Sequence, residues 1–235
     1  ASRLAKDKLY GESWDLSSVK GDVSVVANGF LKRNNLEEII EVYMGNLIGD
    51  KVYDRYGLTF PLLVKTLDCN DVLSVQVHPD DELAKERHNS YGKTEMWYVI
   101  GAEPGAYLYI GFKDKNITRE EFLEAANNDT LPDILNKVEV KPGDVFFIPA
   151  GTIHALGKGI KVIEIQQTSD ITYRVYDWNR VDSEGRGREL HTALAVDAID
   201  YSKSGEECHI KYELVKNEAV KHIDCTYFTI NEIAV

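Results

Sequence analysis

Residues 142–154 read Pro-Gly-Asp-Val-Phe-Phe-Ile-Pro-Ala-Gly-Thr-Ile-His, and this stretch decides the fold. Two turn signals, at 142–144 and 149–152, enclose a strand of four apolar residues. The second turn delivers His154 to the start of the next strand. The spacing therefore predicts two short strands joined by a tight connection, with a histidine where the second strand begins.

Short β runs separated by turn residues lie on both sides of this stretch. They are 62–64, 72–77, 96–100, 106–111, 138–140, 161–167 and 171–178, with a further short run at 23–26 and two more strands within 206–235. Helical patterns are confined to inserts near 35–48 and 118–136 and to a short segment at 193–199. Capping boxes begin the two inserts, at Asn35 with Glu38 and at Thr118 with Glu121. Many short strands with few helices predict a mainly β protein built as a jelly-roll barrel.

The overall charge excludes some classes of partner. The 235 residues contain 27 Lys and Arg against 39 Asp and Glu, a net charge of −12. Proteins that bind nucleic acid through its backbone need a basic surface, so we expect no nucleic-acid partner. No apolar run approaches the ~20 residues that span a bilayer, so we expect no membrane partner. Three widely spaced cysteines predict free thiols and a cytoplasmic location.

Polar residues interrupt two of the predicted strands. Side chains two residues apart on a strand share a face, so Ser74, Gln76 and His78 should point the same way. Lys93 and Glu95 share a face at the start of another strongly apolar strand. Buried polar groups without partners are unfavourable, so these side chains need partners in the fold.

Gln76, His78, Glu95 and His154 together offer one amide, two imidazoles and one carboxylate. This nitrogen and oxygen set suits Zn²⁺ and also Fe²⁺, Mn²⁺, Co²⁺ or Ni²⁺. Each residue also has an ordinary explanation as a hydrogen-bonded structural group. The residues alone therefore leave a metal site and a structural polar cluster as equal alternatives.

The motifs also resemble a known family. Gly143, Asp144, Pro149, Gly151 and His154 resemble the second signature of the cupin superfamily. Combined with Ser-Val-Gln-Val-His-Pro at 74–79, Gly-Lys-Thr-Glu-Met-Trp at 92–97 and the stretches 164–180 and 188–191, they resemble the type I mannose-6-phosphate isomerases, particularly the shorter bacterial and archaeal branch. The resemblance covers roughly residues 8–200, with four motifs in family order.

The resemblance implies a fold and an activity. It implies a metal-binding cupin domain over residues 1–170 and C-terminal strands with a short helix over 171–235, the latter belonging to a second jelly-roll that is present only in part. It implies one Zn²⁺ per chain held by Gln76, His78, Glu95 and His154, with Gln76 the weakest ligand. The implied reaction is the interconversion of mannose 6-phosphate and fructose 6-phosphate through an enediol.

Further residue roles follow from the same resemblance. Arg174 stands at the position of the catalytic arginine, and Ser74, Lys93 and Arg180 stand where family members place groups near the substrate. For the base, Lys93, Glu164 and a zinc-bound hydroxide remain alternatives. A pKa depressed by the metal and by neighbouring cations would suit Lys93 to this role.

Two other classes of protein remain as alternatives to this activity. One is another metal-dependent cupin enzyme, such as an oxygenase or a cupin-type glucose-6-phosphate isomerase. The other is a non-catalytic sugar-binding or regulatory cupin. Retention of both Arg174 and Lys93 argues mildly against a pure binding protein.

Overall fold

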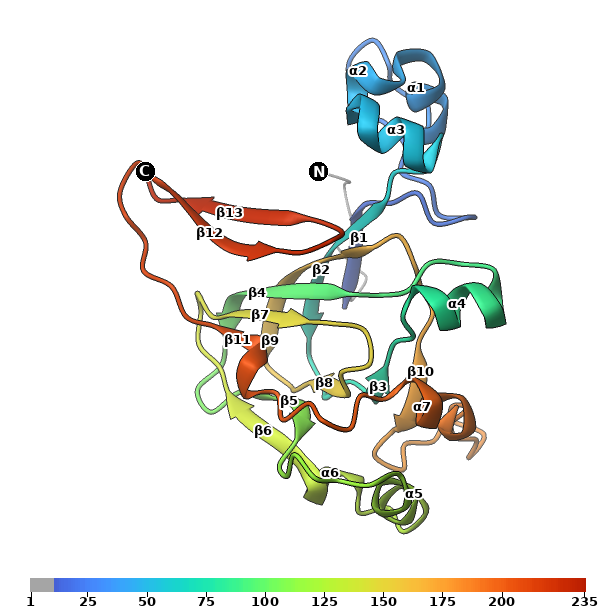
Figure 1. The fold of residues 1–235 in the computed structure, drawn as a ribbon, viewed down its shortest axis with the longest axis vertical. Helices are drawn as coiled ribbons and strands as arrows, with labels where there is room; N and C mark the ends of the chain where they lie inside the picture. Colours follow the sequence, from blue (N-terminus) through green and yellow to red (C-terminus); the bar gives the residue numbers. More distant parts are fainter. Residues whose placement is uncertain (1–10) are drawn as a thin grey trace.

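The computed structural model describes residues 11–235, and two antiparallel sheets packed face to face form its body (Figure 1). One sheet has the order β1 (Glu12–Leu16), β2 (Leu62–Cys69), β9 (Ile160–Gln167), β4 (Glu95–Ala102), β7 (Val145–Ile148) and β11 (His209–Ile210). The other has the order β10 (Tyr173–Tyr176), β3 (Val75–Val77), β8 (His154–Leu156), β5 (Tyr107–Phe112) and β6 (Leu135–Glu139). The predicted mainly β fold is confirmed, and most of the predicted runs coincide with strands.

The space between the sheets is a continuous apolar core at one end. Trp97 and Phe146 of the six-stranded sheet belong to the same buried cluster as Leu108 and Ile110 of the five-stranded sheet. Along β2 buried and partly buried residues alternate strictly, as expected for a strand with one face turned to a core. The polar residues of the predicted site lie on this same inner face, at the other end of the sandwich.

Helices cover the outer face of the five-stranded sheet. They are α5 (Arg119–Asn127), α6 (Leu131–Ile134) and α7 (Thr192–Ala198) (Figure 1). Phe122 and Leu131 of this layer pack in one buried cluster with Val75 and Phe112 of the sheet. The capping box of Thr118 and Glu121 forms as predicted.

A second group of helices projects beyond the sheets (Figure 1). It comprises α1 (Leu36–Tyr43), α2 (Gly45–Ile48) and α3 (Asp50–Tyr56). The capping box of Asn35 and Glu38 begins α1 as predicted, but the chain forms a third helix after Gly49, where the sequence pattern predicted an end. Gly49 turns the chain with φ 88° and so joins two short helices. No helix among residues 11–235 is long and apolar enough to cross a membrane.

Three local predictions differ from the structure. The run at 23–26 forms only the isolated bridge of Val25 with Asn35, and β1 was not predicted. Helix α4 (Asp81–His88) was also missed because it buries only Ala84 and therefore has no apolar stripe to reveal it.

The C-terminal strands form two structures. After the short 3₁₀ turn η1 (Glu206–Cys208), β11 pairs with β7, while β12 (Ala219–Asp224) and β13 (Thr229–Ile233) form a separate hairpin. The hairpin packs Ile223 and Phe228 against the outer face of the six-stranded sheet. Strands β10 and β11 thus join the two main sheets from beyond residue 170, and the predicted division into two domains there stays a prediction.

Gly205 marks a close contact between two backbones. It has φ +82°, and a Cβ built on it would lie 2.0 Å from the carbonyl oxygen of Ile110. Gly111, with φ +65°, approaches the same segment from β5. Gly185 has a similar φ of +78° but has no atom within 4 Å of its Cβ position. A comparison of Gly205 with Gly185 therefore separates the effect of backbone conformation from that of the close contact.

We expect Gly185→Ala to lower the free energy of unfolding by about 1–2 kcal/mol, because an L side chain is disfavoured at positive φ. Gly205→Ala should lower it by roughly 1–3 kcal/mol more, since the added methyl must push β5 away from residue 205. Urea unfolding followed by circular dichroism measures both changes. Equal losses in the two variants would show that the contact with Ile110 does not constrain the fold.

Candidate functional site

Strand register places three of the predicted site residues in one row. In the five-stranded sheet Gln76 lies opposite His154 on one side and opposite Arg174 on the other. Directly opposed residues of antiparallel strands project from the same face, so all three side chains share the inner face. His78 follows two residues after Gln76 and reaches the same cluster.

The six-stranded sheet contributes a second set of polar residues to the inner face. Glu95 lies opposite Gln166, while Glu164 lies between Trp97 and Lys65 on the neighbouring strands. These side chains are nearly all buried. The two sheets therefore bring acidic and basic groups together in the interior, where each charge needs a partner.

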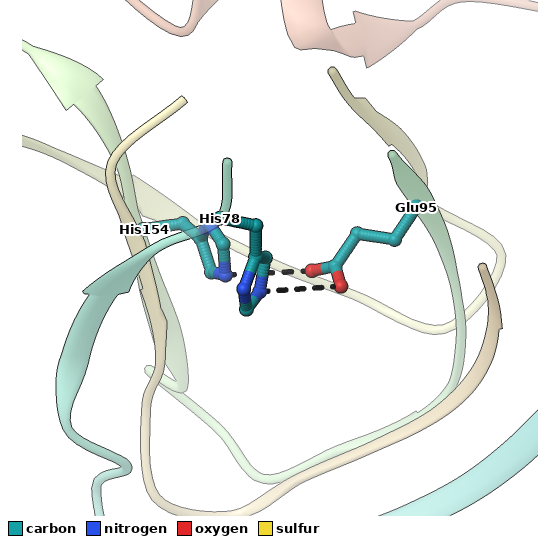
Figure 2. Close-up of side chains that lie close together, drawn as sticks. All are labelled: His78, Glu95 and His154. Atoms are coloured by element: carbon teal, nitrogen blue, oxygen red, sulfur yellow. Dashed lines mark ion pairs between the residues drawn. The ribbon is translucent and has the colours of Figure 1, made fainter. Parts of the chain in front are cut away.

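His78, Glu95 and His154 form a compact cluster (Figure 2). Glu95 Oε2 lies 3.5 Å from His78 Nε2, and Glu95 Oε1 lies 3.4 Å from His154 Nε2. One ligand atom from each residue lies within 4.8 Å of the other two, and each residue is at most 1% exposed. The arrangement matches the convergence of donors that a divalent metal requires.

Hydrogen bonds from the other ring nitrogens select the tautomer of both histidines. The Nδ1 of His78 donates to the carbonyl of Ile171 at 2.9 Å, and the Nδ1 of His154 donates to the carbonyl of Thr152 at 2.8 Å. Burial lowers the pKa of both rings, to about 4 for His154. Both rings are therefore neutral at pH 7 and direct an Nε2 lone pair at the cluster, the form that binds metals.

Glu95 is the group that most needs a cation. Burial and the nearby Glu164 carboxylate raise its pKa. Its Oε1 is buried and accepts no hydrogen bond from the described residues. A divalent ion at the cluster would compensate this charge, so the residues present fit a metal. Gln76 lies at the edge of the cluster, with its Nε2 3.3 Å from His154 Nε2.

Lys93 contacts two of the side chains that form this cluster. Its Nζ forms an ion pair with Glu95, lies 3.1 Å from His78 Nε2 and lies 3.7 Å from Glu164 Oε1. Burial favours a lower pKa for Lys93, but Glu164 and Glu95 outweigh it and raise the pKa. Two carboxylates therefore raise the pKa of Lys93 in the absence of a metal, and the depression expected from a bound metal stays a prediction.

Glu164 carries a negative charge, opposite to that of Lys93. Burial favours a higher pKa for this carboxyl, but Lys93 and Lys65 outweigh it and lower the pKa. Trp97 Nε1 donates to Glu164 Oε2 at 2.8 Å, and Lys65 Nζ lies 3.6 Å from Glu164 Oε1. Glu164 is thus a buried carboxylate anion beside the metal cluster. A base in the reaction would have to lie in this interior position.

Arg174 lies at the other end of the row from His154. Its Nε donates to Ser74 Oγ at 3.3 Å, and its Nη1 donates to the carbonyl of Glu189 at 3.0 Å. An ion pair with Asp170 or Asp177 would give this arginine an ordinary structural role. Asp177 instead pairs with Arg180 and Arg188. Ser74 and Arg174 are therefore brought together next to Gln76, while Arg180 lies on the loop after β10.

The sequence analysis missed Lys65 as part of the site. Its side chain is about one-tenth exposed, and it contacts Glu164 at 3.6 Å and Glu12 at 3.3 Å. It also lies 4.8 Å from the ring centroid of Trp14, a cation–π contact. The alternation of β2 contained the signal, because Lys65 falls between Leu63 and Leu67 on the buried face.

Asp81 positions the loop that contains Lys93 and leads into β4 at Glu95. Its Oδ1 accepts hydrogen bonds from the Gly92 amide and from Gln167 Nε2, both at 2.9 Å. Gln167 in turn accepts a hydrogen bond from the Thr94 amide at 2.9 Å. Tyr227 of the C-terminal hairpin donates to Asp81 Oδ2, also at 2.9 Å. The buried end of β4 is therefore tied to α4, β9 and the hairpin through one carboxylate.

Known proteins resemble the chain in sequence and in fold. Residues 1–98 match the family model described as phosphomannose isomerase type I, catalytic domain. A mannose-6-phosphate isomerase of Streptococcus mutans is 40% identical over 220 residues, covering 94% of this chain and 67% of that protein.

Solved structures agree with the sequence matches. The crystal structure of the mannose 6-phosphate isomerase from Bacillus subtilis superposes with a TM-score of 0.78 at 35% identity, covering 94% of this chain and 69% of the other. A zinc-bound mannose 6-phosphate isomerase shares the fold, with a TM-score of 0.67 at 15% identity over 93% of this chain and 74% of the other.

The geometry of the cluster predicts one transition-metal ion per chain. Chelator-treated protein should bind one equivalent of Co²⁺ or Zn²⁺, and Glu95→Gln or His154→Ala should weaken binding by at least about tenfold, because each removes a donor. Calorimetry and the visible absorption of Co²⁺ measure this without any activity assay.

His209→Gln is the matched control, because His209 lies outside the cluster and pairs with Asp144. It should leave metal binding unchanged. Equal metal affinities of Glu95→Gln and the unaltered protein would rule out the cluster as the metal site.

Proposed function

We propose, since this chain belongs to the type I mannose-6-phosphate isomerase family, that it interconverts mannose 6-phosphate and fructose 6-phosphate. The single observation that carries the proposal is the buried His78, Glu95 and His154 cluster with Lys93 and Glu164 beside it. An aldose–ketose isomerisation needs a polarised carbonyl, a group that moves a carbon-bound proton and a group that moves an oxygen-bound proton. The cluster and its neighbours offer a candidate for each requirement.

Zn²⁺ is the proposed metal, held by His78, Glu95 and His154 with Gln76 as the fourth protein ligand. When bound, the ion would supply Lewis-acid polarisation of the sugar carbonyl. Neutral imidazoles and a carboxylate with a free oxygen support the three-residue part of this assignment. Gln76 joins it only with its Oε1 turned toward the cluster, where its Nε2 now lies 3.3 Å from His154 Nε2. Each ring donates a hydrogen bond from Nδ1 to a backbone carbonyl, of Ile171 for His78 and of Thr152 for His154, and this keeps both Nε2 atoms oriented toward the site.

Glu164 and Lys93 are the proposed proton-transfer pair. Glu164, as a carboxylate, accepts the proton from C2 of mannose 6-phosphate and returns it to C1. Lys93, as an ammonium, gives a proton to O1 and takes one back from O2, so that both residues end in their starting states. The opposite pKa shifts of the two groups support this division of roles. Lys93 as the carbon base, acting as a neutral amine, is the competing assignment.

Arg174 is the proposed electrostatic stabiliser of the developing oxyanion. Its guanidinium stays charged at any working pH and lies in the same row as Gln76 and His154. Ser74, through its hydrogen bond with Arg174, and Arg180, through its charge, are proposed to lie near the substrate and its phosphate.

We expect isomerase activity on mannose 6-phosphate to disappear when the metal is chelated and to return with Zn²⁺. Arg174→Ala should lower kcat by about 10²–10³-fold, because it removes a charge aimed at the oxyanion. Arg119→Ala is the matched control, since Arg119 is exposed on α5 and pairs with Asp197 of α7, on the outer face of the five-stranded sheet. A coupled assay on metal-analysed protein measures all three. Binding of mannose 6-phosphate without turnover in zinc-loaded, folded protein would point to a sugar-binding protein instead.

Hydrogen exchange in heavy water distinguishes the two bases. With Glu164 as the carbon base, Glu164→Gln should lose deuterium incorporation at C1 of fructose 6-phosphate, while Lys93→Arg should retain it at a reduced rate. Arginine preserves the positive charge but does not deprotonate at working pH. Loss of exchange in Lys93→Arg with retention in Glu164→Gln would reverse the assignment. NMR of the product measures the exchange.

A further inference from the structure

Strand β10, which contains Arg174, is an edge strand of the five-stranded sheet. Among the described strands it pairs with β3 alone. In a strand the N–H and C=O of one residue point to the same side, and at an open edge they need partners from another part of the chain. Both backbone groups of Arg174 find their partners in a single residue, His191.

His191 takes the place of a neighbouring strand at this edge. Its amide donates to the carbonyl oxygen of Arg174 at 2.6 Å. The amide of Arg174 donates in the other direction, to His191 Nδ1 at 3.2 Å. The ring nitrogen therefore replaces the carbonyl oxygen that a paired strand would offer, and Arg174 is bonded through both of its backbone groups.

The contact with Nδ1 decides which form of the ring holds Arg174. A backbone N–H can only donate, so Nδ1 has to carry a lone pair and the ring proton has to lie on Nε2. This tautomer is the reverse of that of His78 and His154, whose Nδ1 atoms donate to backbone carbonyls. The Nε2 of His191 lies 3.9 Å from the exposed carboxylate of Glu189, beyond hydrogen-bond distance.

The segment that contains His191 also holds the guanidinium group of Arg174. The Nη1 of Arg174 donates to the carbonyl of Glu189 at 3.0 Å, two residues before His191. On the other side of the guanidinium, Nε donates to Ser74 Oγ at 3.3 Å. One short stretch, 189–191, therefore contacts both the main chain and the side chain of Arg174.

Helix α7 anchors this stretch, and it lies beside β10 (Figure 1). The carbonyl of His191 accepts hydrogen bonds from the amides of Leu194 and Ala195, at 3.0 and 2.9 Å, and so begins the helix. Ala195 and Val196 are buried in the cluster that includes Val75 of β3. The packing of α7 therefore fixes the backbone of His191, and the ring contact with Arg174 depends on its side chain.

We propose that His191 is a positioning residue for Arg174, and that it acts through the lone pair of Nδ1. The inference rests on the proposed function, in which Arg174 stabilises the developing oxyanion. A charge stabilises a transition state most when it is already ordered before the reaction, because no reorganisation is then needed. His191 supplies this order from the edge of the sheet, without contact with the substrate or the metal.

Replacement of His191 should affect kcat more than KM. His191→Leu removes the Nδ1 lone pair, keeps the backbone amide and retains much of the side-chain volume. It should lower kcat by about 3- to 10-fold, the loss of one hydrogen bond, with KM within about twofold and unchanged metal content. His191→Asn should restore most of this loss, since its Oδ1 takes the place of Nδ1 as acceptor. Arg119→Ala is the control, because it removes a contact of α7 with Asp197 and leaves 189–191 unaltered.

A double-mutant cycle separates positioning of Arg174 from general stability. In the Arg174→Ala background, His191→Leu should cause no further loss of kcat, because no guanidinium is left to position. An equal loss of kcat in both backgrounds would overturn the inference, and so would a His191→Asn variant as impaired as His191→Leu.

NMR tests the same geometry without turnover. In protein labelled with ¹⁵N at histidine and arginine, the His191 ring should carry its proton on Nε2. The side-chain Nε–H signal of Arg174 should broaden in His191→Leu and stay sharp in His191→Asn. These results are expected even if mannose 6-phosphate is not isomerised, so failure of the proposed function is distinguishable from failure of the inference.

A His191 ring that carries its proton on Nδ1 would contradict the proposal, as would an Arg174 signal that is the same in His191→Leu and in the unaltered protein. Should His191→Leu fail to fold, the tautomer of His191 in the unaltered protein still decides the outcome.

Discussion

The carboxylate of Glu95 is the constraint on which the rest of this structure depends. It is completely buried, and removing a charged group from water costs several kcal/mol unless opposite charge replaces the lost hydration. The fold places Lys93, His78 and His154 against it. The buried ammonium of Lys93 in turn needs further negative charge, which Glu164 provides. Lys65 then compensates Glu164 at the next position outward, so buried charges of alternating sign extend from the metal cluster to the sheet edge.

Strand register decides whether these groups meet. Gln76, His154 and Arg174 come from three strands, and they share a face only because each pair is directly opposed. A shift of one residue in β3 would turn Gln76 and His78 away from the interior and place Val75 and Val77 there instead. Those valines now pack under the helices α5 to α7 on the outer face. The same alternation that buries the apolar side of β3 therefore delivers its polar side to the site.

Carboxylates outside the sandwich organise the segments around it. Asp81 receives hydrogen bonds from the loop before β4, from β9 and from the C-terminal hairpin. Asp177 gathers Arg180 and Arg188 on the loop after β10, and those hydrogen bonds outweigh burial in lowering its pKa. Each carboxylate lies where a loop leaves a strand that carries site residues. The rigid sheets thus position the metal cluster, while paired charges position the loops that surround it.

The sequence by itself determined the mainly β fold, the two capping boxes and the candidate metal residues. These depend on local chemistry: turn residues at fixed spacing, alternation along a strand, and a capping side chain three residues from its partner. The proximity of His78, Glu95 and His154 followed from the family resemblance, and the structure confirms that the three residues converge. The roles assigned to Lys93, Arg174, Ser74 and Arg180 stay predictions. Only the tertiary structure revealed Lys65, the two carboxylates that surround Lys93, the helix α4 and the shared carboxylate of Asp177. The charge contacts among them join segments that are distant in the chain, and α4 has no apolar stripe to reveal it.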